Sequence, residues 1–479
     1  MILEIQPVEL FSHPTPEERA PKSATIEESN RLGSSNASRR RFKHSIEAAA
    51  IAYEIEPSRV SSKDFLMKNH RDIAISTDLE PDDVFAFLIL FHEANEIYKA
   101  TGKYPIDLII VGEGNTAIKK MRMEKLIHDY FDVPPEVTIQ VVEGRSSRSN
   151  IFTYDGEELF SRETLAAVPF PEQDQTAHAA DVLKAWAEQA QSPMIIQLKP
   201  ALELLSLPED LAKKIDVLFY GSFNLRKTAD DPLLLSDQEL GFAHLSTPAA
   251  KLEWLMQLFS QRFNQLGIIE TFGVLGDQAS VAADFPWSHE LGNLVATSDD
   301  PFIQMFRTLC EKWNRYTTER ILADCLKITK KLPQSPLTTH LQTEFEALSQ
   351  TFNQQQFAKV RETILSQSTQ ILATLDAAAG RSWNTMVRKL DLGHKINQGV
   401  QFTLADILVA MAATSRGSEL FHTSPIQAKY DANGFLVPET DDHSNIAHYG
   451  RVSPEKIANW LVQHLEERAA RHFACGTPD

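Results

Sequence analysis

The chain has 479 residues, 43% of them hydrophobic, so it is long enough to bury a sizeable core in one large domain or in several smaller ones. Its formal net charge of -18 argues against nucleic-acid binding, because an acidic surface repels phosphates. We find no apolar run near the roughly 18 residues that span a bilayer, and no standard signal peptide. The three cysteines are odd in number and widely spaced, which favours a reducing compartment, and we therefore expect a cytoplasmic protein, with non-standard export left open.

Residues 1–66 are predicted to form a flexible extension. They hold Pro14, Pro16, Pro21 and a long polar run, and they contain few periodic apolar positions before residue 45. The basic triplet at residues 39–41 could be a targeting or phosphate-contact patch, but a solvated run in a flexible segment is the favoured interpretation.

A regular alternation of elements begins near residue 71. Helix-like, amphipathic stretches separate most of the apolar segments. The predicted strands are residues 72–77, 105–112, 136–144, 193–199, 215–221 and 269–276, and the predicted helices include residues 81–98, 116–131, 176–190 and 249–266. Fully apolar strands that alternate with helices predict an α/β fold, with a mostly parallel, Rossmann-like sheet covered by helices on both faces. In such a sheet the ligand site lies at the carboxyl ends of the strands.

Residues 300–400 break this alternation. Segments 301–329, 338–353 and 357–380 have helical periodicity, so we predict a helical insertion there. A helix near 402–414 and a last helix at 453–473 follow. We therefore expect one α/β domain over residues 67–479, interrupted by an insertion that offers a surface for a protein partner.

The segment "TDLEPDD", residues 77–83, is the most unusual in the chain. Its four acidic side chains, Asp78, Glu80, Asp82 and Asp83, repel one another next to an apolar run. They could cap a helix, hold a hard cation such as Ca²⁺ or Mg²⁺, or act as a carboxylate pair in glycosyl or phosphoryl chemistry. The spacing alone favours capping and metal binding equally.

The same segment resembles the signature of the nucleoside hydrolases, whose first strand ends in Asp-x-Asp-Pro-Gly-x-Asp-Asp. Asp78, Asp82 and Asp83 fall on the second, third and fourth aspartates of that signature. Ser76 stands at the first aspartate, and residues 79–81 replace Pro-Gly-x.

Four later segments resemble family motifs in the same order along the chain. "VGEGN" resembles a Gly-Asn loop through Gly114 and Asn115, and "QLKPALEL" resembles Thr-Gly-Pro-Leu-Thr-Asn, with Leu198 at the threonine position and Pro200 at the proline position. "FYGSFN" resembles Met-Gly-Gly through Gly221. "LADILVAMAA" resembles His-Asp, with Ala405 at the histidine position and Asp406 at the aspartate position. The resemblance covers roughly residues 70–280 and 400–479.

The resemblance implies a bound Ca²⁺ ion. Its ligands would be the carboxylates of Asp78, Asp83 and Asp406 and the main-chain carbonyl of Leu198. This set leaves coordination positions for a water and two substrate hydroxyls. Without the resemblance, Asp406 would be interpreted as a helix N-cap.

The implied reaction is hydrolysis of the N-glycosidic bond of ribonucleosides or related ribosyl compounds. Asp78 would take the proton from water, and Asp82 and Asn115 would hold ribose hydroxyls. Asn115 could equally be a turn residue after Gly114. Tyr154 and the two residues after it are a candidate lid.

The chain departs from the family at the leaving group and at the sugar. Ala405 replaces a histidine that often protonates the departing base. Asn224 and Arg226 stand where the family has a Glu-x-Asn pair, and Arg226 could contact a phosphate of a nucleotide-like substrate, although a surface arginine is slightly favoured. A metal-dependent phosphohydrolase, a non-catalytic binding module that docks a protein through its insertion, and a homo-oligomer stay open.

Overall fold

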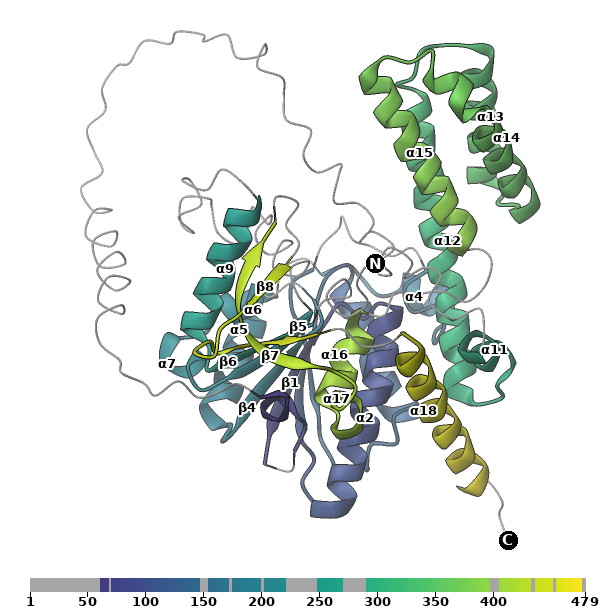
Figure 1. Cartoon of the computed structure of the whole chain (residues 1–479). Helices are drawn as coiled ribbons and strands as arrows, with labels where there is room; N and C mark the ends of the chain where they lie inside the picture. Colours follow the sequence, from purple (N-terminus) through teal and green to yellow (C-terminus); the bar gives the residue numbers. More distant parts are fainter. Residues whose placement is uncertain are drawn as a thin grey trace, which may run out of the picture.

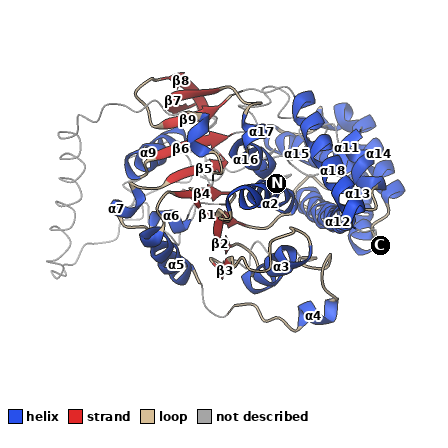
Figure 2. Cartoon of the chain, turned by 90° about the horizontal axis from the view of Figure 1, so that it is seen from below, coloured by secondary structure: helices blue, strands red, loops and turns tan. Residues whose placement is uncertain are grey.

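The computed structural model describes residues 61–68, 70–146, 154–171, 175–199, 202–220, 248–269, 290–396, 405–431, 436–450 and 454–475. These residues form one nine-stranded, mostly parallel sheet with helices on both faces, which confirms the predicted α/β fold (Figure 2). Almost all of the predicted extension, residues 1–66, lies outside the described residues. Among the helices of the described ranges, none combines the length and the apolar character needed to cross a membrane.

The order of the strands places a switch point in the sheet. From one edge to the other the strands are β3 (Gln140–Glu143), β2 (Ile106–Val111), β1 (Asp72–Thr77), β4 (Pro193–Gln197), β5 (Asp216–Tyr220), β6 (Gln265–Ile269), β9 (Ile446–Tyr449), β7 (Thr423–Tyr430) and β8 (Leu436–Thr440). The chain moves outward from β1 to β3, then returns to β4 on the other side of β1. Ligands bind in sheets of this kind where the direction reverses, here between β1 and β4.

Helices bury both faces of the sheet, which explains its continuous apolar strands. One face carries α5 (Thr176–Gln189), α6 (Leu202–Leu205), α7 (Glu209–Ala212) and α9 (Pro248–Arg262), and the other carries α2 (Pro81–Thr101), α3 (Thr116–Asp129) and α16 (Ala405–Ala413) (Figure 2). All five residues of β4 are buried as a result. The smaller helices are η3 (Ser62–Phe65), α4 (Arg162–Ala166), α11 (Glu290–Thr297) and α17 (Ser415–Ser418).

The apolar run in the first half of helix α2 is covered on every side. It packs against α16 and α12 as well as lying over the sheet, with α18 (Pro454–Cys475) in the outer layer beside it (Figure 1). Every residue from Pro81 to Phe91 is buried. The run "VFAFLILF" is therefore the core of this half of the molecule rather than one face of an amphipathic helix.

Four helices stand away from the sheet (Figure 1). They are α12 (Pro301–Thr329), α13 (Pro336–Gln350), α14 (Gln354–Leu372) and α15 (Ala377–Ile396). We call them the arm, and we call the sheet with its covering helices the body. The first half of α12 contributes Phe302 and Phe306 to the core of the body, whereas its second half joins a separate core around Trp383.

Three sequence predictions differ from the structure. The helical run predicted over 357–380 is two helices, because Asp376 accepts from the main-chain nitrogens of Ala378 and Ala379 and starts α15. Strand β6 occupies Gln265–Ile269, where the end of a helix was predicted, and all but the first residue of the strand predicted over 269–276 lies outside the described residues. Gly267 interrupts the apolar pattern of β6, because a Cβ there would lie 2.6 Å from Leu218 Cδ1. Strands β7, β8 and β9 were not predicted, since β7 is only partly buried and lacks an apolar run.

Candidate metal centre

The acidic segment connects β1 to α2 at the switch point. We call residues 78–83 the acid loop. Leu79 has a φ of 53°, in the left-handed region that a leucine rarely adopts, and its main-chain nitrogen donates to Thr77 Oγ1 at 2.9 Å. Pro81 then begins α2, at the position where a proline costs no helical hydrogen bond.

Asp83 is fixed by two hydrogen bonds. Its Oδ1 accepts from Thr77 Oγ1 at 2.5 Å, and its Oδ2 accepts from the main-chain nitrogen of Glu80 at 2.9 Å. The second bond is the capping contact expected of an acidic residue in the first turn of a helix. Capping therefore accounts for part of the role of Asp83, but it does not account for the neighbours of its carboxyl group.

Three buried carboxyl groups meet at this edge of the sheet. Oxygen atoms of Asp78, Asp83 and Asp406 all lie within 4.8 Å of one another, and the residues are 8%, 0% and 2% exposed. Asp406 comes from the first turn of α16, which packs against α2. Within the described part of the chain, no other group of three or more His, Cys, Asp or Glu side chains meets in this way.

Burial and mutual repulsion make these groups hard to ionise. Burial, followed by the carboxylates of the other acid-loop residues, raises the pKa of Asp83 and of Asp406 well above the usual range. Burial and the nearby Glu80 raise the pKa of Asp82 to about 8. The carboxyl groups of Asp78 and Asp83 also hydrogen-bond each other, which requires a shared proton.

This donor set fits a hard divalent cation. Carboxylate oxygens are the ligands that Ca²⁺ and Mg²⁺ prefer, and a cation among them would replace the shared proton and offset the repulsion. Two cationic side chains of α3 lie nearby, but they donate to the main chain of the loop. Lys119 Nζ donates to the Asp78 carbonyl, and Arg122 Nη1 donates to the Leu79 carbonyl at 3.1 Å.

The other predicted site residues lie around this cluster or outside the described residues. Leu198 follows β4, and its main-chain nitrogen donates to the Ser76 carbonyl at 2.8 Å, so it lies beside the end of β1. Asp82 is buried in the first turn of α2. Asn224 and Arg226 fall outside the described residues.

Asn115 has the role of a turn residue in this structure. It is the N-cap of α3, where its Oδ1 accepts from the main-chain nitrogen of Ile118 at 3.4 Å. Because Oδ1 is used in the cap, the side-chain nitrogen of Asn115 is the atom that can donate a hydrogen bond to a ligand. Ala405 is fully buried at the start of α16, so the position of the family histidine carries no proton donor.

Sequence reasoning missed the buried charges on α3. Lys119 and Arg122 are 5% and 1% exposed, and they lie on the same stripe of the helix as the buried Met123 and Leu126. Two cations at helical spacing on an apolar stripe, shortly after an acidic loop, were the available signal.

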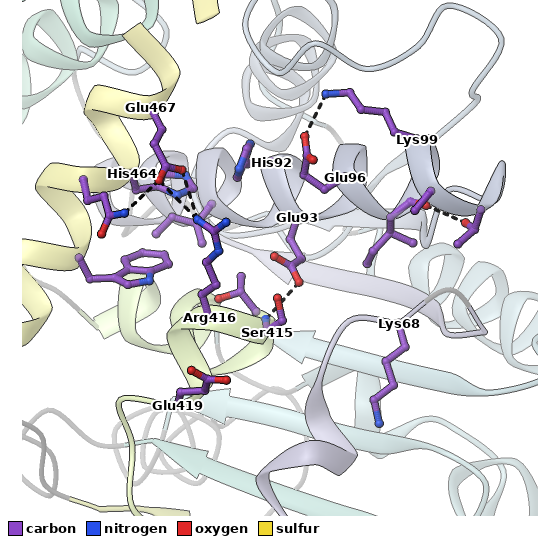
Figure 3. A pocket seen from close by; sticks show the side chains of 17 residues that line it. Lys68, His92, Glu93, Glu96, Lys99, Ser415, Arg416, Glu419, His464 and Glu467 are labelled. Carbon is purple, nitrogen blue, oxygen red and sulfur yellow. Dashed lines mark hydrogen bonds and ion pairs between the residues drawn. The ribbon is translucent and has the colours of Figure 1, made fainter. Parts of the chain in front are cut away.

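A large cleft of the described surface lies elsewhere. It has a volume of about 1140 Å³ and is bounded by the second half of α2, by α17 and α18, and by Lys68 (Figure 3). None of the three clustered aspartates lines it. Its charged groups pair with one another, as Arg416 does with Glu467 at 3.4 Å, so they do not converge on a common point.

No protein-family model and no curated protein sequence matches the chain significantly. Several solved structures align with it, two of which are effector proteins. One is described as the effector protein XOO4466, with 16% identity, a TM-score of 0.37 and coverage of 85% of this chain and 96% of that chain. The other is the type III effector protein XopQ complexed with adenosine diphosphate ribose, with 15% identity, a TM-score of 0.37 and coverage of 85% and 97%. Because a TM-score of 0.37 does not establish a shared fold, the fold of this chain rests on its own sheet.

Proposed function

We propose that the protein is a Ca²⁺-dependent hydrolase of the N-glycosidic bond in ribonucleosides or related ribosyl compounds. The observation that carries this proposal is the meeting of Asp78, Asp83 and Asp406 at the switch point of the sheet. The resemblance of the acid loop and of "LADILVAMAA" to nucleoside hydrolase motifs supports the same activity.

Each residue has a defined part in the proposed reaction. The three aspartates and the Leu198 carbonyl would hold Ca²⁺, which supplies Lewis acidity and eases the loss of a proton from water. Asp78 accepts that proton. Asp82 and the amide nitrogen of Asn115 bind ribose hydroxyls and so fix the position of the reacting carbon.

The buried acidic groups also suit the charge that develops during the reaction. The ribosyl carbon becomes cationic as the bond to the base breaks, and buried carboxylates stabilise a cation placed beside them. Ala405 supplies no proton for the leaving base. We therefore expect bases that depart as neutral molecules, such as the nicotinamide of NAD, to be cleaved better than purines that need protonation.

The test is a metal analysis combined with a release assay. Purified protein should contain Ca²⁺ or take it up, and it should release ribose or a ribosyl product from at least one member of a panel of nucleosides, NAD and ADP-ribose. Chelation should stop the release, and Asp78→Asn should abolish it. Phosphate release with a preference for Mg²⁺ would instead indicate a phosphohydrolase, and metal binding without any turnover would indicate a binding module.

A further inference from the structure

Arg122 lies at the centre of a buried network behind the acid loop. Its Nη1 donates to the Leu79 carbonyl at 3.1 Å and also to the carboxylate of Asp155, and its Nε donates to Glu158 Oε1 at 2.7 Å. The side chains of all three charged residues are at most 4% exposed. One guanidinium thus joins α3, the acid loop and the segment that contains Asp155 and Glu158.

The hydrogen bond from Arg122 to the Leu79 carbonyl stabilises the acid-loop residue that has a left-handed backbone conformation. The left-handed conformation of Leu79 is unfavourable for a residue with a Cβ, so it persists only where neighbours impose it. Arg122 fixes the carbonyl of Leu79, and Lys119 fixes that of Asp78. Because Leu79 follows Asp78 directly, these two bonds fix the stretch of main chain that carries the side chain of Asp78.

Arg122 keeps its charge despite its burial. Burial works to lower the pKa of Arg122, but the carboxylates of Glu158 and Asp155 outweigh it and raise the pKa above its usual value, with a further contribution from Asp83. The guanidinium therefore adds a permanent positive charge beside the acid loop without occupying the space between the clustered carboxyl groups.

The segment on the other side of Arg122 is attached to the arm. Tyr154 Oη donates to Glu319 Oε1 on α12 at 2.7 Å, and Lys312 Nζ on α12 lies 2.6 Å from Glu157 Oε2. The Arg315 guanidinium lies 5.3 Å from the centre of the Tyr154 ring. Residues 154–158 are therefore packed between α12 and α3 rather than forming an open lid.

Gly156 allows the turn at residues 154–158 to pack closely against α3. Its φ is 85°, and a Cβ there would lie 2.8 Å from Leu165 Cδ2 and 3.2 Å from Ile118 Cγ2 on α3. The turn therefore sits tightly on α3, on the side chains next to Arg122. A shift of α12 would be passed on through a segment with little room to absorb it.

We propose that Arg122 is a positioning residue that couples the base of the arm to the acid loop and so sets the affinity of the loop for its metal ion. This inference rests on the proposed function in one respect, namely that the acid loop holds Ca²⁺. The path runs from Glu319 and Lys312 on α12, through residues 154–158, to Arg122 and the carbonyl of Leu79.

The experiment compares the full-length wild type with Arg122→Lys and with the double variant Tyr154→Phe/Glu319→Gln. Ca²⁺ affinity is measured by calorimetry, and amide hydrogen exchange of residues 77–87 is measured in metal-free protein. We expect Arg122→Lys to weaken Ca²⁺ binding by about tenfold, the lower end of the loss typical for residues that support metal ligands without touching the ion, and to speed exchange in the acid loop. The double variant should weaken binding by a few-fold.

A matched control lies within the arm. Arg361 pairs with Asp391 between α14 and α15, outside the path to the loop, so Arg361→Lys should leave both measurements unchanged. Unchanged Ca²⁺ affinity and unchanged exchange in a folded Arg122→Lys protein would overturn the inference. If that variant does not fold, Asp155→Asn makes the same test, because it keeps the guanidinium and removes one of its anchors.

The two proposals can fail separately. If the wild type binds no Ca²⁺ but exchange in the acid loop still responds to Arg122→Lys, the proposed function fails and the positioning role stands. If the wild type binds Ca²⁺ and neither readout responds, the proposed function stands and the positioning role fails.

Discussion

Acidic side chains in the arm and in the acidic cluster of the body have opposite surroundings. In the arm, Asp391 pairs with Arg361 and both stay partly exposed to solvent. In the body, Asp83 and Asp406 are buried, and other carboxyl groups raise the pKa of each. The charges of this arm pair are compatible with the folded chain and water alone, whereas the clustered carboxyl groups of the body favour a proton or a cation beside them. The difference assigns ligand chemistry to the body and leaves the arm as a candidate surface for proteins.

The boundary between the two regions runs across one helix. Helix α12 is about 43 Å long at 1.5 Å per residue, and it packs Phe302 against the body and Leu322 against the arm. A change at either end therefore reaches the other only through this helix or through the residues that bind its side, such as Tyr154.

The largest expected effect is the loss of a carboxylate from the cluster. Asp406→Asn should lower ribohydrolase activity by about 10³-fold and abolish detectable Ca²⁺ binding, because it removes a charged ligand from a buried site. The matched arm variant, Asp391→Asn, should leave activity within twofold of the wild type. Steady-state kinetics of both variants make the comparison, and equal losses would show that the cluster has no special role.

A cavity in the arm should damage the arm alone. Trp383 is fully buried in the arm core, so Trp383→Ala should lower the free energy of unfolding of the arm by about 3–5 kcal/mol. Hydrogen exchange of α13, α14 and α15 reports this loss, and Ca²⁺ affinity should change by less than threefold. A large fall in affinity would mean that the two regions are a single cooperative unit.

Acid should weaken the body through His448 on β9. Burial lowers the pKa of His448 to about 4, so the folded state keeps the ring neutral while the unfolded chain takes up a proton below about 6.5. The stability linked to this group is therefore complete above pH 6.5 and is lost as the pH falls towards 4, by about 3 kcal/mol.

Denaturant unfolding of the wild type and of His448→Gln at several pH values isolates this contribution. The difference in free energy of unfolding between the two proteins should shrink or reverse in favour of the variant between pH 6.5 and 4. A constant difference over that interval would show that His448 is not held neutral by burial.

The smallest effect concerns competition between protons and the metal ion. The raised pKa of Asp82, about 8, means that metal-free protein loses stability as the pH rises from about 4 towards 8, and a bound cation would restore it. Ca²⁺ should therefore bind more tightly as the pH rises from 6 to 8, by up to about tenfold per pH unit for each proton displaced. Calorimetry in buffers of different ionisation enthalpy counts those protons, and a flat profile would contradict the raised pKa.

The sequence was most informative where both faces of a strand are buried. The largely apolar sequences of β1 and β4 predicted buried parallel strands. Because ligand sites lie at the carboxyl ends of such strands, the sequence also placed the acid loop at the edge of the sheet where the structure has it. The meeting of Asp78 with Asp406 was expected only through the family resemblance, since a lone aspartate at a helix start is usually a cap. The antiparallel strands β7 and β8 and the short strand β9, which pairs in parallel with β6, lack an apolar run, and so they were missed.

Buried charges were the hardest feature to predict. Arg122 has the ordinary appearance of a cation on a helix, and only the fold shows that Asp155 and Glu158 reach it from a later segment. Pairing between distant residues is set by tertiary packing, which local periodicity does not report.

The site needs residues from both ends of the chain, and this has a consequence for biosynthesis. More than three hundred positions separate the acid loop from Asp406, and the whole arm lies between them in the sequence. While a ribosome is still making the arm, the nascent polypeptide has two of the three clustered carboxyl groups but not the third. Proteolytic cleavage or premature termination before α16 would likewise leave fragments that carry a recognisable signature and no working centre.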